Sequence, residues 1–190
     1  MAESSNWLIL IYKIPPEPSR YRVALWRRLK GAGAVYLQNS VCILPDSPAN
    51  RELFQDLYRE IEESGGESLI LEAKALNAAD QERIIDRFNA ERDEEYSEFL
   101  EQCEAFLAEI RHETERQNFI FGELEENEEG LQRLVTWLQK IERRDFFGAA
   151  KAAEARKRLT ECQEALEAFY AKVFAASELS PDGGKRHEQR

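Results

Sequence analysis

Histidine, methionine and cysteine are scarce in this chain, and their scarcity excludes several kinds of site. Its 190 residues include two histidines, one methionine and three cysteines. The sequence offers no Ser-His-Asp or Cys-His catalytic arrangement, no zinc-finger spacing and no glycine-rich phosphate loop. The cysteines Cys42, Cys103 and Cys162 lie far apart among apolar neighbours, which is typical of buried reduced thiols and not of a disulfide framework. We therefore expect no organic cofactor.

Long apolar runs are also lacking. No stretch of eighteen or more apolar residues occurs, so the sequence predicts no membrane-spanning helix. The N-terminus M-A-E-S-S-N-W lacks the basic and then apolar order of a signal peptide. We expect a cytoplasmic protein with no membrane partner.

Positive charge is in deficit overall but concentrated in one place. The chain has 26 Lys and Arg against 37 Asp and Glu, a net charge of −11, which argues against simple electrostatic attachment to nucleic acid or anionic lipid. Residues 1–76 carry a net charge of only −1, and residues 77–190 carry −10. Within the first part, residues 13–30 hold six basic side chains and the lone acid Glu17. Any functional hypothesis must explain this basic segment.

The first part of the chain alternates strand and helix signals. Residues 7–14 form an apolar run that ends at Pro15-Pro16, and residues 34–38 and 41–44 are short strand-like runs on either side of Asn39-Ser40. Amphipathic helices are predicted from Ser19 to Gly31 or Gly33 and over residues 49–64, and a last strand over 68–76. The β-α-β-β-α-β order predicts a ferredoxin-like α+β domain over residues 6–76.

The second part of the chain is helical. Apolar positions recur at helical spacing over residues 80–114, 125–144 and 149–175, with Phe119-Ile120-Phe121-Gly122 as a break between the first two. Three such stripes joined by short turns predict an antiparallel three-helix bundle over residues 78–176. The polar, Gly-containing tail 177–190 is expected to be disordered.

One segment of the chain carries a family resemblance. The segment is W-L-I-L-I-Y-K-I-P-P-E-P-S-R-Y-R-V-A-L-W-R-R-L-K-G-A-G-A-V-Y-L-Q-N-S-V-C-I-L-P. It resembles the opening of the ChrB N-terminal domain family of chromate-resistance regulators, in its W-L-x-x-x-Y-x-x-P, S-x-x-R-V-x-x-W-R-x-L-K and G-A-x-x-L-x-x-S-V-x-x-L-P patterns. The later segments F-G-E-L-E-E-N-E-E-G-L-Q-R-L and R-R-D-F-F-G are also similar to the family. A fainter similarity exists to the ferredoxin-like domain of phenylacetate-catabolism repressors and to a small CRISPR-associated nuclease.

The resemblance implies a bacterial, chromate-responsive transcriptional regulator that binds operator DNA, with chromate as its effector. The chain stops near the end of the predicted bundle, so the separate C-terminal domain of that family is missing from it. Two functions therefore stay open. The chain either binds DNA, with the acidic bundle serving dimerisation or signal coupling, or it is a non-DNA-binding interaction or sensor module whose C-terminal function comes from a separate partner protein.

The basic segment supplies the candidate binding residues. Leu25, Trp26 and Leu29 fall on one arc of its helix, and most of its arginines fall on the opposite arc. Arg22 is the exception, because it projects onto the apolar arc and would need a carboxylate, a carbonyl or a bound anion there. The DNA- or anion-binding candidates are Lys13, Arg20, Arg22, Arg27, Arg28 and Lys30. The alternative is a solvated basic face that offsets the acidic bundle.

Three further alternatives receive less support from the sequence. The CRISPR-associated relatives hold a divalent cation with an acidic residue at the end of the first strand, but here that strand ends in Tyr12-Lys13-Ile14, so we expect no enzyme. Glu109, His112 and Glu113 have a spacing used by metal-binding bundles, yet no second such pair exists and a solvated acidic face explains them better. Chromate is reducible by thiols, but the apolar context of Cys42 favours an inert thiol.

Overall fold

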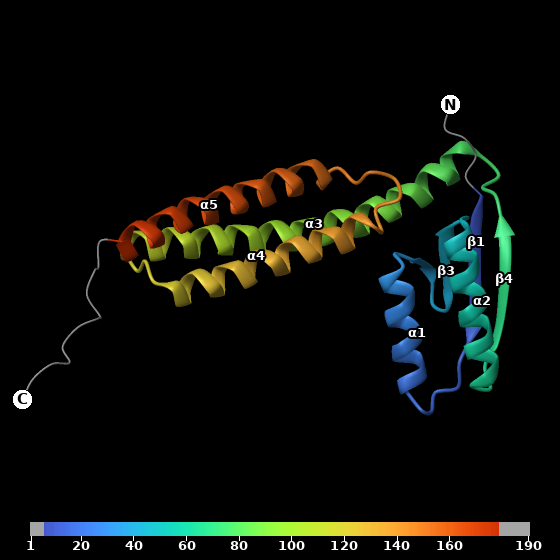
Figure 1. Ribbon diagram of the computed structural model, residues 1–190. Coiled ribbons are helices and arrows are strands. Elements are labelled where there is room, and N and C mark those ends of the chain that lie inside the picture. The colour runs from blue at the N-terminus through green and yellow to red at the C-terminus, as the bar shows by residue number, and fades with distance from the viewer. Residues whose placement is uncertain (1–5, 179–190) are drawn as a thin grey trace, which may run out of the picture. The chain divides into compact units, whose positions relative to one another are not determined.

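The computed structural model describes residues 6–178, which form four strands and five helices of a mixed α+β fold (Figure 1). Strands and two helices alternate first, and three longer helices follow. The elements are β1 (Trp7–Lys13), α1 (Arg20–Gly31), β2 (Val35–Gln38), β3 (Val41–Pro45), α2 (Pro48–Glu63), β4 (Glu67–Ala73), α3 (Ala78–Glu115), α4 (Phe121–Glu142) and α5 (Ala152–Glu178). None of these helices is both long enough and apolar enough to cross a membrane.

The strands form a single antiparallel sheet in the spatial order β2-β3-β1-β4. β1 is central and pairs over most of its length with both β3 and β4. The turn between β2 and β3 places Ser40 beside β1, where the Tyr12 amide donates a hydrogen bond to the Ser40 carbonyl at 3.0 Å. The sheet therefore brings the end of β1 and the β2–β3 turn together.

Side chains on one face of β1 contribute to the hydrophobic core of the sheet region. Leu8 and Leu10 are buried, and with Leu25 and Leu29 of α1 they belong to one hydrophobic cluster. The cluster continues into α2, whose Phe54, Leu57 and Ile61 recur at helical spacing. Leu25 and Leu29, four residues apart, therefore mark the side of α1 that packs against the core.

Trp7, the first residue of β1, makes aromatic contacts with two segments that are distant in the sequence. Its ring is 1% exposed and stacks on Phe88 of α3 with a centroid distance of 5.7 Å. Phe147, which follows α4 in the chain, lies 5.7 Å from the same indole. The Trp7 Nε1 donates to the Gln81 side-chain oxygen at 2.8 Å, so the polar end of the buried indole is satisfied.

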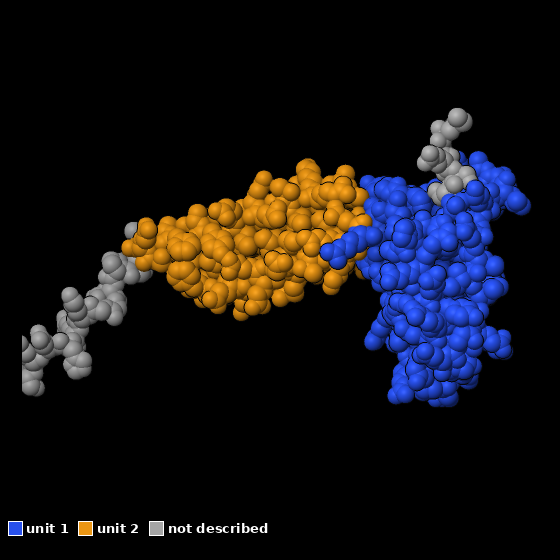
Figure 2. All heavy atoms as spheres, turned by 45° about the vertical axis from the view of Figure 1, so that its right-hand side comes forward, with its two compact units in different colours: residues 1–93, 143–150 blue, residues 94–142, 151–190 orange. Residues whose placement is uncertain are grey.

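The chain forms two compact units, which Figure 2 shows in different colours. Unit 1 comprises residues 1–93 and 143–150, and unit 2 comprises residues 94–142 and 151–190. Unit 1 thus includes the short segment after α4 that carries Phe147, and it holds the whole sheet with α1 and α2. The predicted domain limits, 6–76 and 78–176, stay a prediction.

Unit 2 is built from α4, α5 and the later part of α3, which lie side by side (Figure 1). Phe99 of α3 packs edge-on against Trp137 of α4 at 5.8 Å between ring centroids. The buried cluster of this unit contains Ile110, Leu124, Leu166, Phe169 and Val173. Periodic apolar stripes on all three helices therefore supply the core.

Two predicted helix limits are wrong. The middle helix of unit 2 begins at Phe121 and not near residue 125, because Gly122 falls in its first turn, outside the helix interior where glycine is costly. Residues 177–178 of the predicted tail belong to α5. The remainder of that tail, residues 179–190, lies outside the described residues.

Candidate anion-binding site

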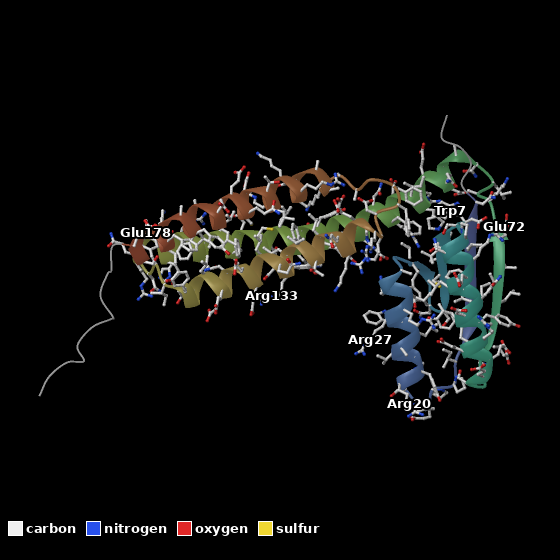
Figure 3. All side chains as sticks on the ribbon, viewed as in Figure 1. Trp7, Arg20, Arg27, Glu72, Arg133 and Glu178 are labelled. Carbon is white, nitrogen blue, oxygen red and sulfur yellow. The ribbon has the colours of Figure 1, made fainter. Side chains whose placement is uncertain are left out.

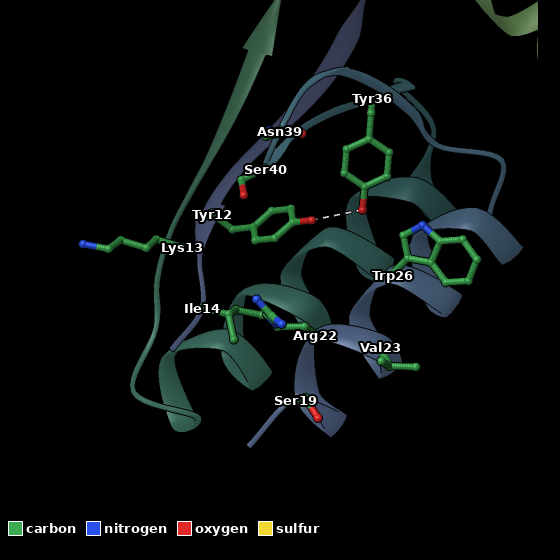
Figure 4. A pocket seen from close by; sticks show the side chains of 10 residues that line it. All are labelled: Tyr12, Lys13, Ile14, Ser19, Arg22, Val23, Trp26, Tyr36, Asn39 and Ser40. Atoms are coloured by element: carbon green, nitrogen blue, oxygen red, sulfur yellow. Dashed lines mark hydrogen bonds between the residues drawn. The ribbon is translucent and has the colours of Figure 1, made fainter. Parts of the chain in front are cut away.

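A hollow of about 640 Å³ lies between the end of β1, the first two turns of α1 and the β2–β3 turn (Figure 4). The aromatic and apolar part of its wall comes from Ile14, Val23 and Trp26 together with the rings of two tyrosines. The polar part includes the guanidinium of Arg22 and the hydroxyls of the two tyrosines, whereas Figure 4 shows the Lys13 ammonium pointing away from the hollow. Its lining residues are Tyr12, Lys13, Ile14, Ser19, Arg22, Val23, Trp26, Tyr36, Asn39 and Ser40.

Two tyrosines meet in this hollow. The hydroxyls of Tyr12 and Tyr36 lie 3.0 Å apart and share a hydrogen bond. Burial raises the pKa of Tyr36 well above its ordinary range, and burial likewise raises the pKa of Tyr12. Both phenols therefore remain protonated near neutral pH. One hydroxyl proton joins the pair, and the other is left to donate to a bound group.

Arg22 is exposed and lines the hollow, so the prediction that it lies on a buried apolar arc is wrong. Figure 4 shows its guanidinium reaching toward Ile14 and the ring of Tyr12. It makes no hydrogen bond or ion pair with any residue between 6 and 178. Trp26, predicted on the same buried arc, is 51% exposed. The core covers Leu25 and Leu29, and the neighbouring positions of α1 face the hollow instead.

The start of α1 adds positive potential beside the hollow. Its first turn contains no acidic residue, and its N-cap residue, Ser19, makes no side-chain cap hydrogen bond. The first amide groups of a helix lack intrahelical partners and carry the positive end of the helix dipole. Ser19 lines the hollow, and the start of α1 therefore lies beside it.

The other predicted basic residues divide into two groups. Arg28 forms an ion pair with Glu60 and lies 4.0 Å from Asp56, and Lys30 pairs with Glu91 at 2.8 Å. These two cations offset acidic residues within unit 1. Lys13, Arg20 and Arg27 are exposed and form no ion pair with a described residue. Arg20 lies 5.2 Å from the ring of Tyr21, and Figure 3 shows Arg20 and Arg27 projecting from α1.

Glu109, His112 and Glu113 are brought together in unit 2, with one potential ligand atom of each within 4.8 Å of the others. Glu113 is buried and already accepts hydrogen bonds from Asn118 at 2.5 Å and from His112 Nδ1 at 3.2 Å. The Asn118 hydrogen bond, with a smaller contribution from His112, lowers the pKa of Glu113. Both carboxylate oxygens thus have partners within the protein, and we infer no metal ion at this position.

All three thiols are buried, and we expect them to be unreactive in the folded protein. Each cysteine is 0% exposed, and Cys42 Sγ donates to the Leu10 carbonyl at 3.8 Å. Burial raises the pKa of Cys42 to about 12, which removes the nucleophilic thiolate at pH 8. A disulfide reagent such as Ellman's should therefore label no thiol in the native chain and three in urea. Fast labelling of Cys42 in the native chain would contradict this expectation and would support a redox role for its thiol.

The sequence alone pointed to Arg22 and Lys13 but missed the rest of the hollow. Tyr36, Asn39 and Ser40 belong to a hairpin that the sequence predicts, yet nothing local indicates that β1 would lie beside its turn. The available signal was an aromatic residue with a polar end in each of the first two strands along the chain, Tyr12 and Tyr36.

Two comparisons identify similar proteins. A family model described as "Protein ChrB, N-terminal" matches residues 22–180. Protein ChrB from Cupriavidus metallidurans is 31% identical over 94 residues, which are 50% of this chain and 28% of that relative. The aligned part thus covers less than a third of that protein. No solved structure matches the chain significantly.

Proposed function

The chain belongs to the ChrB N-terminal family, and from this membership we propose that it is a chromate-resistance protein, a cytoplasmic DNA-binding transcriptional regulator that responds to chromate. The proposal includes operator DNA as partner and chromate as effector. It assigns no catalytic step to the chain, since the candidate side chains described above are suited to binding anions.

The observation that carries the proposal is the set of exposed cations on α1 and at the end of β1. Lys13, Arg20 and Arg27 have no ion-pair partner among the described residues, although the chain as a whole carries a net charge of −11. Guanidinium groups bind phosphate oxygens through forked hydrogen bonds, and phosphate contacts supply most of the affinity of a DNA-binding protein. Two such groups on one helix of an acidic protein, Arg20 and Arg27, are suited to a DNA backbone, and Lys13 adds an exposed ammonium at the end of β1.

We also propose a specific architecture for each of the two units. The strand order β2-β3-β1-β4 and the β-α-β-β-α-β sequence of elements support a ferredoxin-like unit 1. The mutual contacts of α3, α4 and α5 support an antiparallel three-helix bundle, to which we assign dimerisation or signal coupling.

The test is an operator shift by the full chain. The promoter region beside its own gene would be titrated at several salt concentrations, with and without chromate and with sulfate as a control anion. We expect binding that weakens steeply with salt and that chromate reduces more than sulfate does. If the promoter region binds no better than unrelated DNA at low salt, the proposal of a DNA-binding regulator fails.

A second candidate function is an interaction or sensor module that does not bind DNA. The pairing of Arg28 with Glu60 and of Lys30 with Glu91 favours it, because these two cations act within unit 1. This function would require a separate partner protein through which the module acts. A pull-down from the source bacterium that captures such a protein, combined with no operator shift, would select it over the regulator.

A further inference from the structure

Arg22 stands out among the cations of α1, because its charge faces a concave wall and has no partner there. Arg28 and Lys30, one to two turns further along the helix, each have a carboxylate. The ten residues that line the hollow include Arg22 and Lys13 but no Asp or Glu. A guanidinium turned toward a cavity that offers no anion of its own leaves a site for an anion from outside.

Neutral donors surround this charge. The Tyr12 and Tyr36 pair keeps one hydroxyl proton for a ligand, and Ser40 lines the same hollow. The Tyr12 amide holds the Ser40 carbonyl at 3.0 Å, which fixes the β2–β3 turn against β1. Donors thus approach from a helix, a strand and a turn, which suits a group with acceptor oxygens on several sides.

From this arrangement we infer that the hollow beside Arg22 binds a tetrahedral oxyanion group, held by the guanidinium of Arg22 and by the one hydroxyl proton that the Tyr12 and Tyr36 pair leaves free. The link between such a site and chromate rests on the proposed function, but oxyanion binding itself does not. The volume of about 640 Å³ exceeds what a four-oxygen ion fills, and Trp26 presents an exposed aromatic wall. The group is therefore either a free inorganic dianion or the phosphate of a molecule whose aromatic part lies on Trp26.

Binding would be measured by isothermal titration calorimetry on the full chain in a chloride buffer free of phosphate. The probes are sodium sulfate, sodium chromate and adenosine monophosphate. Arg22→Gln should weaken binding by about tenfold or more, since a hydrogen-bonded charge is lost. Tyr12→Phe combined with Tyr36→Phe, which removes both hydroxyls and so the proton available to the ligand, should weaken binding by roughly threefold to tenfold.

Arg27→Gln is the matched control, because it removes the same charge from the same helix at a position that does not line the hollow. It should change affinity by less than about twofold, since screening at moderate salt reduces the effect of a distant exposed charge. Thermal unfolding of each variant verifies that it is folded. Equal losses for Arg22→Gln and Arg27→Gln would overturn the inference, and so would the absence of binding of all three probes at millimolar concentration.

The probes separate the two sources of the oxyanion. Tighter binding of the nucleotide than of sulfate and chromate would identify a phosphate carried by an aromatic molecule, and the reverse order would identify an inorganic dianion. Either order supports the site. The operator shift is independent of this measurement, so a chain that binds oxyanions without shifting DNA would disprove the regulator and leave the oxyanion site in place.

Discussion

Replacing Trp7 with alanine is expected to destabilise unit 1 by about 3–5 kcal/mol, the usual cost of truncating a large buried aromatic side chain. Trp7 is 1% exposed, and its indole lies between Phe88 and Phe147, which belong to segments distant in the sequence. The substitution also leaves the Gln81 side-chain oxygen without its indole donor. The loss should appear as a lower urea midpoint and as faster amide hydrogen exchange in β1 and β4, which are in direct register at this residue.

Two further variants make this prediction specific. Trp7→Phe keeps an aromatic ring against Phe88 and should cost only about 1–2 kcal/mol. Trp26→Ala deletes the same side chain at a 51% exposed position and should cost less than about 1 kcal/mol. If Trp7→Ala and Trp26→Ala cost the same, the burial of the Trp7 indole would not be what stabilises unit 1.

The sequence predicted the elements of the sheet region well, because the signals for them are local. The apolar run before Pro15 predicted β1, and the i, i+4 recurrence of Leu25 and Leu29 predicted the buried side of α1. The family resemblance, which depends on short residue patterns, is confirmed by the family model that matches residues 22–180.

What the sequence could not predict depends on contacts between distant segments. Arg28 and Lys30 pair with carboxylates that are 32 and 61 residues away in the sequence. Helical periodicity does not reveal such distant partners, so the sequence alone grouped both residues with the unpaired cations. Arg22 fell on the apolar arc of a helical wheel, but a wheel does not say how much of that arc a sheet covers. The tyrosine pair of the hollow likewise requires the strand order, which joins Tyr12 to Tyr36 across 24 residues.

The division between paired and free cations leads to the second large expected effect, which concerns DNA. Arg20→Glu combined with Arg27→Glu should weaken operator binding by about tenfold or more at 0.1 M salt. Affinity falls with salt, so the slope of log affinity against log salt is negative. Each lost phosphate contact should also reduce the magnitude of this slope by about 0.9. The expected change in slope for the double variant is therefore about 1.8, measured by fluorescence anisotropy at four or more salt concentrations.

Two control variants distinguish phosphate contacts from a general effect of charge. Arg111→Glu combined with Arg133→Glu changes the net charge equally at exposed positions of unit 2 and should leave the slope unchanged. Arg28→Gln combined with Lys30→Gln removes cations that Glu60 and Glu91 already neutralise, so it should change the slope by less than about 0.5. A slope that falls as much for Arg28 and Lys30 as for Arg20 and Arg27 would mean that DNA breaks these ion pairs. In that case the contact surface would follow the whole basic segment, as the sequence alone suggested, and the ion pairs would compete with DNA for the same cations.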